Sequence, residues 1–135
     1  LQARLQQQRL NIPAGRLCIP LPASHQSLKK RGYNPASEIA KELAKLNGWR
    51  ISHDALRRDQ TRLYTEQKSL DSLERRLNVR DLYYCSYRLE EDEVILIDDV
   101  LTSGATIDSA CQALKAAGVK RIHVIVIARA QLLTH

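Results

Sequence analysis

The sequence of 135 residues predicts a single α/β domain, in which a mostly parallel, twisted sheet is flanked by helices. Two apolar runs, at 94–97 and 122–128, lack polar alternation and are typical of strands buried on both faces of a parallel sheet. Segments of helical composition alternate with the predicted strands, which favours right-handed crossovers. A chain of this length buries roughly two thirds of its unfolded surface, enough for one core.

Local signals predict the order of the elements along the chain. We expect a helix and linker over 1–16, a strand over 17–21, a loop over 22–32, a helix over 35–48, an extended segment over 49–58, a mobile loop over 59–69, a helix over 70–77, a strand over 83–89, an acidic turn over 90–93, a strand over 94–97, a helix over 106–117 and a strand over 122–128. All of 1–135 is therefore assigned to one domain.

The clearest of these helices is the one that follows Asn34, a natural N-cap, and stops near Gly48. Its apolar stripe is expected to consist of Ile39, Leu43 and Leu46.

Composition excludes several classes of protein. Cys18, Cys85 and Cys111 lie far apart, which indicates neither a disulfide framework nor a zinc site. No apolar stretch approaches the roughly twenty residues of a membrane span, and residues 1–10 are too polar for a signal peptide. We therefore expect a cytoplasmic protein. The chain begins with Leu and contains no Met, so we expect a fragment that lacks the native N-terminus.

Charge is unevenly distributed. Residues 1–88 contain 17 Lys and Arg against 8 Asp and Glu, a net charge of +9, whereas residues 89–135 contain 4 against 7, a net charge of −3. The basic part suits a polyanion, either the phosphates of a small substrate or a nucleic acid backbone. The alternative for any single Lys or Arg is an ordinary solvated surface.

Residues 94–106 read VILIDDVLTSGAT and carry the strongest functional signal. The small and hydroxyl residues after the strand form a turn that opens the next helix, whose first N–H groups make an anion site. Gly104 permits a positive φ, and Ala105 keeps bulk away from a phosphate that approaches the backbone. The residues assigned to this phosphate are Thr102, Ser103, Gly104, Ala105 and Thr106.

Two acids, Asp98 and Asp99, precede this turn. Carboxylates repel an anion in a semi-buried site, so a neutral group must lie between them and the phosphate. A ribose fits, because its hydroxyls donate to carboxylates while its 5-phosphate reaches the turn. The alternative is that these Asp and Thr residues only cap the helix.

The motif resembles the 5-phosphoribosyl-1-pyrophosphate (PRPP) motif of type I phosphoribosyltransferases. Two further stretches are IPLPASHQSLKKRGYN at 19–34 and RRDQTRLYTEQKSLDSLERRLNVRDLYY at 57–84, which contain R-G-[FY]-N, R-x-x-T-R and E-R-R-x-N-V-R. The ordered set resembles the ComF family, phosphoribosyltransferase-like proteins associated with competence for DNA uptake in bacteria. The resemblance implies the type I phosphoribosyltransferase fold.

The resemblance also implies roles for individual residues. Asp98 and Asp99 would hold the ribose and stabilise positive charge that develops on it. The candidates for the pyrophosphate and for a loop that closes over PRPP are Ala23, Ser24, Arg31, Gly32, Arg62 and Gln67. Mg²⁺ would be carried by PRPP rather than by direct protein ligands.

Three functions remain open at this point. The first is a ComF-like protein that binds PRPP with Mg²⁺ and takes part in DNA uptake, with single-stranded DNA, competence machinery proteins or further copies of the chain as partners. The second is a metabolic nucleobase or amido phosphoribosyltransferase, and the third is a regulator that senses PRPP without transforming it. No residue indicates an acceptor site, so whether the protein is an enzyme stays open.

Overall fold

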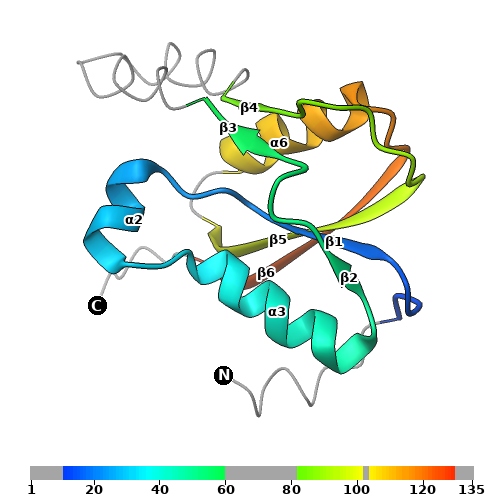
Figure 1. Cartoon of the computed structure of the whole chain (residues 1–135), viewed down its shortest axis with the longest axis horizontal. Coiled ribbons are helices and arrows are strands. Elements are labelled where there is room, and N and C mark those ends of the chain that lie inside the picture. Colours follow the sequence, from blue (N-terminus) through cyan, green and yellow to red (C-terminus); the bar gives the residue numbers. More distant parts are fainter. Residues whose placement is uncertain (1–10, 60–81, 102–103, 130–135) are drawn as a thin grey trace.

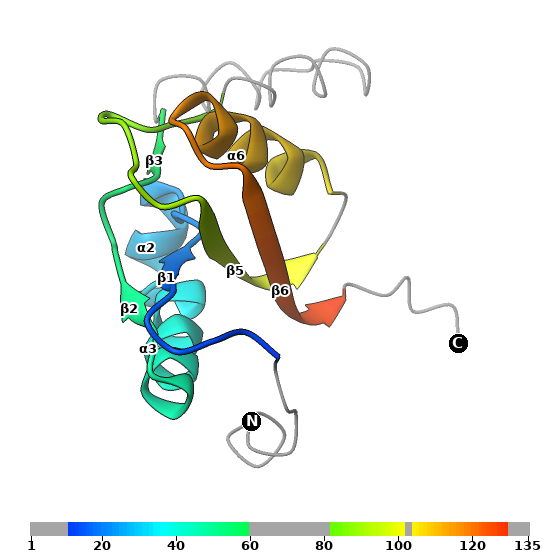
Figure 2. The ribbon, with the colours of Figure 1, turned by 90° about the vertical axis from the view of Figure 1, so that its right-hand side faces the viewer.

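The computed structural model describes residues 11–59, 82–101 and 104–129. A parallel sheet of four strands lies at its centre, with helices on both faces (Figures 1 and 2). The strands are β1 (Leu17–Pro20), β2 (Arg50–Ile51), β5 (Glu93–Leu101) and β6 (Arg121–Arg129), in the order β2-β1-β5-β6. The helices are α2 (His25–Arg31), α3 (Pro35–Asn47) and α6 (Ala105–Ala116). The predicted α/β class is confirmed.

Strand β5 is buried on both faces, as its apolar run predicts. Val94 and Leu96 pack in the core cluster beneath α6, whereas Ile95 and Ile97 pack in the cluster beneath α3. This alternation is the ordinary consequence of the strand period of two residues. The sheet therefore separates two apolar layers, one under α6 and one under α3.

The helix signals near Asn34 are also confirmed. The Asn34 side chain accepts from the Ala36 N–H as the N-cap, and Gly48 ends α3 in the left-handed conformation at φ 71°. The expected stripe was wrong in one member, because Leu46 is 46% exposed. Three alanines complete the buried face of α3 instead: Ala36, Ala40 and Ala44.

The structure corrects three predicted elements. Residues 22–32 are not all loop, because α2 forms within them. The predicted strand at 94–97 continues to Leu101, since β6 pairs with β5 beyond the end of β1. Residues 83–89 form only a two-residue strand, β4 (Tyr83–Tyr84), which pairs antiparallel with β3 (Arg57–Arg58) in a separate small sheet.

After β4 the chain leaves the small sheet and contacts the end of α6. The Leu89 N–H donates to the carbonyl of Ala117, the C-cap of α6, and the Leu89 side chain is buried. This contact leads the chain into β5. The helix and linker expected over 1–16, the loop at 59–69 and the helix at 70–77 lie wholly or mostly outside the described residues.

The three cysteines are free thiols. Burial raises the pKa of Cys18 to about 12, and it also raises the pKa of Cys85 and of Cys111. In the described segments no helix has the length and apolar character of a membrane span.

We expect Leu43→Ala to lower the free energy of unfolding by about 2–5 kcal/mol, because it removes a side chain that is 1% exposed and leaves a cavity under α3. Leu46→Ala is the matched control, in the same helix but exposed, and should change it by less than about 0.5 kcal/mol. Urea unfolding followed by circular dichroism measures both. Equal losses in the two variants would contradict the observed orientation of α3.

We expect iodoacetamide at pH 8 to modify Cys18 more slowly than Cys85 or Cys111 in the native protein. A raised pKa lowers the reactive thiolate fraction at pH 8, and Cys18 is buried as well. Mass spectrometry of timed samples measures the three rates, and denaturant should make them similar. Native modification of Cys18 at the rate of the other two would contradict its buried position on β1, in the apolar cluster beneath α3.

Candidate functional site

The strand order reverses between β1 and β5. From β1 the chain crosses to β2 on one side, and from β5 it crosses through α6 to β6 on the other side. In open α/β sheets, ligands bind in the crevice beyond the carboxyl ends of the strands at such a reversal. In this chain the reversal lies between the residues that follow Pro20 and the second half of β5.

Strand register brings the end of β1 beside the two acids of the 94–106 motif. Pro20 pairs with Ile97, and the Leu21 N–H donates to the Ile97 carbonyl at 2.8 Å. The Asn34 side-chain amide donates to the Leu21 carbonyl at 3.1 Å. The R-G-Y-N segment at 31–34 is therefore attached to the end of β1, next to Asp98.

Asp98 and Asp99 occupy different environments. Asp98 is 7% exposed, and its Oδ1 accepts from the Asp99 N–H at 2.9 Å. The Asp99 side chain is 27% exposed. Both acids lie inside β5, where neighbouring side chains alternate between faces. The sequence assigned both acids the same role, whereas the structure contains one buried acid and one accessible acid.

The accessible acid has a cationic partner. Arg31 Nη1 lies 3.6 Å from Asp99 Oδ2, and the Arg31 side chain is 55% exposed. This ion pair joins the last residue of α2 to the second half of β5, two segments that the sequence assigned separately to pyrophosphate and ribose. The structure thus brings Arg31 and Asp99 together.

Helix α2 occupies the predicted pyrophosphate loop. The hydroxyl of Ser24 caps it, accepting from the Ser27 N–H at 3.1 Å, while Ala23 directly precedes this cap. Gly32 ends it at φ 80°, a conformation that favours glycine. The signals for this helix were present in the sequence as a Ser N-cap and a Gly at the C-terminal end, but they were read as a loop.

Helix α6 begins where the 5-phosphate was predicted. Gly104 is its N-cap at φ 84° and makes no side-chain cap hydrogen bond. The alternative, in which Asp and Thr residues serve only as caps, therefore receives no support from the described cap residue. Ala105 and Thr106, both partly buried, form the first turn.

Four predicted site residues lie outside the described residues: Thr102, Ser103, Arg62 and Gln67. Within the described segments, no group of three or more His, Cys, Asp or Glu residues is arranged to hold a metal ion. The two carboxylates fit an ion that arrives with its own oxygen ligands, because Mg²⁺ keeps most of its hydration and uses few protein groups.

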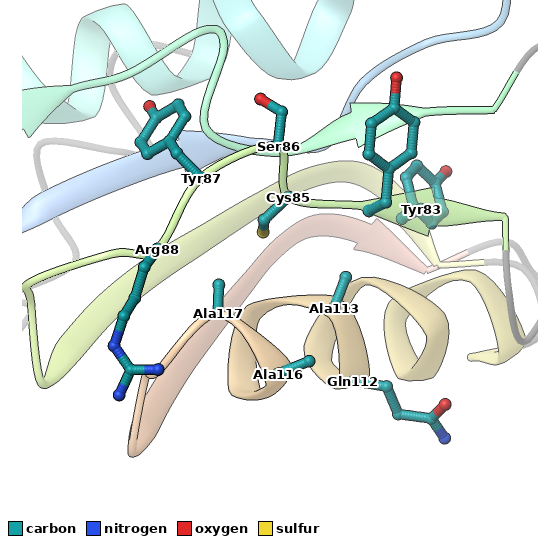
Figure 3. Close-up of a pocket in the computed structure, with 10 residues that line it drawn as sticks. Tyr83, Cys85, Ser86, Tyr87, Arg88, Gln112, Ala113, Ala116 and Ala117 are labelled. Carbon is teal, nitrogen blue, oxygen red and sulfur yellow. The ribbon is translucent and has the colours of Figure 1, made fainter.

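A pocket of about 610 Å³ lies elsewhere, between residues 83–88 and the last part of α6 (Figure 3). Cys85 points from the strand side toward Ala113 and Ala117, while Tyr87 points away (Figure 3). The lining residues of α6, from Gln112 to Ala117, lie at the opposite end of that helix from Gly104. No sequence signal predicted this pocket, which is separate from the 94–106 motif.

Comparisons with known proteins agree with the geometry. The phosphoribosyl transferase domain matches residues 27–132. Competence protein F of Haemophilus influenzae is 32% identical over 116 residues, which are 83% of this chain and 49% of that protein. HGPRTase-like protein 3 of Haloterrigena turkmenica is 42% identical over 38 residues, 28% of this chain and 20% of that protein.

The chain thus spans about half the length of the first of these relatives and less of the second. No solved structure was found to match it. The domain match covers most of the chain, including β5 with its two acids and the helix that follows them, whereas β1 precedes the matched residues. The chain therefore belongs to the phosphoribosyltransferase domain family, in which it is ComF-like.

Proposed function

We propose that this protein binds PRPP together with Mg²⁺ at Asp98–Thr106 and takes part in DNA uptake as a ComF-like protein. The observation that carries the proposal is the Arg31–Asp99 ion pair at the reversal of strand order, with α6 beginning six residues after Asp99 in the sequence. A sugar with a phosphate at each end needs hydroxyl acceptors between two groups of anion donors, and we assign these roles to the two acids, the start of α6 and Arg31.

The 5-phosphate would lie against the turn that opens α6. Gly104 and Ala105 present little side-chain bulk there, and the twelve-residue helix directs the positive end of its dipole at the turn. A phosphate at this position replaces a side-chain cap. The hydroxyl groups of Thr102, Ser103 and Thr106 would add donors.

The ribose hydroxyls would donate to the carboxylates. Asp99 is the more accessible of the two, and the buried Asp98 holds the Asp99 backbone through its hydrogen bond to the N–H. We assign hydroxyl binding to both acids, with Asp98 also fixing the backbone. Negative charge here would stabilise a ribose that develops positive charge at its anomeric carbon.

The pyrophosphate would lie toward the loop after β1. Arg31 offers paired donors suited to phosphate oxygens, and Lys29 and Lys30 precede it in the last turn of α2. The other residues assigned to this side are Ala23, Ser24, Gly32, Arg62 and Gln67. Mg²⁺, when bound, would neutralise pyrophosphate oxygens and would be held mainly by them and by water.

The proposal concerns binding, and it does not require a transfer reaction. A metabolic phosphoribosyltransferase would need an acceptor, and a PRPP-sensing regulator would need none. We assign the protein to the cytoplasm, where PRPP and incoming DNA would both be available. Competence protein F is the relative whose name supports the link to DNA uptake.

We further propose that the basic part of the chain contacts single-stranded DNA. Residues 1–88 have a net charge of +9, and Lys29 and Lys30 are exposed on a helix that buries none of its residues. Such contacts are electrostatic and independent of base sequence.

We expect isothermal titration of PRPP in the presence of Mg²⁺ to give saturable binding that Asp98→Asn with Asp99→Asn weakens by at least about tenfold. Two hydrogen bonds from the ribose to charged acceptors are lost, each contributing about 1.5–3 kcal/mol. The control is Glu90→Gln with Asp92→Asn, which changes charge equally at the far end of β5 on exposed residues. Unchanged affinity in the site variant, or equal losses in both, would contradict the site assignment.

We expect an oligothymidine to bind with an affinity that falls as salt rises, by roughly 0.7 log units per phosphate contact for each tenfold increase. Lys29→Ala with Lys30→Ala should make that slope shallower by about one unit. Lys115→Ala with Lys120→Ala removes the same charge from the acidic last third and should leave the slope unchanged. Fluorescence anisotropy measures both, and absence of binding at low salt would reject direct DNA contact.

A further inference from the structure

The Arg31–Asp99 ion pair occupies two groups that the proposed ligand would also use. Arg31 Nη1 and Asp99 Oδ2 are 3.6 Å apart, which is too long for a good hydrogen bond, and both side chains reach solvent. Ion pairs of this exposed kind contribute little to stability and exchange readily for other partners. The fold therefore depends little on either side chain of this pair.

Helix α2 can release Arg31 at low cost. None of its seven residues is buried, whereas its flanks are held by the Ser24 cap and by the hydrogen bond from Asn34 to the Leu21 carbonyl. A segment with few buried contacts between fixed ends moves without disturbing the core. Arg31 is at the end of this helix, and its long side chain adds further reach.

We propose that Arg31 exchanges partners on binding: its guanidinium leaves Asp99 for the pyrophosphate of the ligand, and the Asp99 carboxylate thereby becomes available to the ribose hydroxyls. This inference rests on the function proposed above. It makes Arg31 a specificity-determining residue, because breaking the ion pair is compensated only by a ligand that carries phosphate on the anomeric side. Ribose 5-phosphate must break the pair without that compensation.

The size of this discrimination follows from the strength of the pair. In the open form of the protein the Arg31–Asp99 pair is broken. A ligand that binds only this form has an apparent affinity equal to its intrinsic affinity multiplied by the fraction of molecules that are open. For an exposed ion pair the penalty corresponds to about a two- to fivefold loss of affinity. PRPP also breaks the pair, but its pyrophosphate offsets the penalty by making a charge-assisted contact with Arg31. Removal of Arg31 should therefore act in opposite directions on the two ligands.

The experiment measures the Kd of PRPP and of ribose 5-phosphate for Arg31→Ala at one Mg²⁺ concentration and one ionic strength. Calorimetry suits the tighter ligand, and amide chemical shifts suit the weaker one while confirming that the variant is folded. The control is Lys30→Ala, which removes the same charge from the same turn. We expect Arg31→Ala to weaken PRPP by about tenfold or more and to bind ribose 5-phosphate about two- to fivefold more tightly than Lys30→Ala does.

A second pair of variants shows whether the gain depends on Asp99. In the Asp99→Asn background, Arg31→Ala should give no gain in ribose 5-phosphate affinity over Lys30→Ala, since the ion pair is already absent. A gain that persists in that background would overturn the exchange and indicate a general effect of charge.

The remaining outcomes separate this inference from the proposed function. If the wild type binds PRPP but Arg31→Ala weakens both ligands as Lys30→Ala does, the exchange is wrong and the PRPP site stands. If the wild type binds neither ligand, the proposed function fails and the exchange fails with it.

Discussion

The parallel pairing of β1 with β5 is the constraint on which the rest of the structure depends. Its register sets Pro20 opposite Ile97, so β1 ends where the acids of β5 begin. Both strands are buried between two helical layers, and a slip of one residue would move apolar side chains out of their clusters. The same slip would exchange the environments of Asp98 and Asp99. Core packing therefore helps to determine which carboxylate faces solvent.

Local signals predicted those elements whose defining contacts lie within a few residues. Asn34 caps α3 through an N–H two residues away, and Gly104 and Gly118 bracket α6 with positive φ values. The extension of β5 to Leu101 depends instead on pairing with β6, some thirty residues further along the chain. Periodicity could not show that Leu46 is exposed, since the buried face of α3 is completed by the small side chains of Ala36, Ala40 and Ala44. Apolar pattern alone does not measure how closely a helix approaches a sheet.

The site was predicted in composition but not in arrangement. Its residue types are readable because acids, small residues and basic residues occur in fixed order. The contact between Arg31 and Asp99 joins residues 68 positions apart, and it exists because α2 returns the chain to the end of β1. Helix α2 itself was missed because it has no buried side chains and therefore no apolar period. A Ser followed eight residues later by Gly is the signal by which it could have been found.

The exposure of the Arg31–Asp99 pair determines what it can do. A buried pair would be held by the large penalty for leaving either charge unpartnered, and a ligand could not displace it at ordinary concentrations. At a partly solvated position, water compensates each charge during the exchange, so the pair is weak enough to open. Ribose 5-phosphate offers hydroxyl groups to Asp99 but no phosphate to Arg31, so it cannot give both side chains a new partner. PRPP carries phosphate on both sides of its ribose and can do so. A weak contact between two side chains is therefore able to distinguish ligands that share the same sugar.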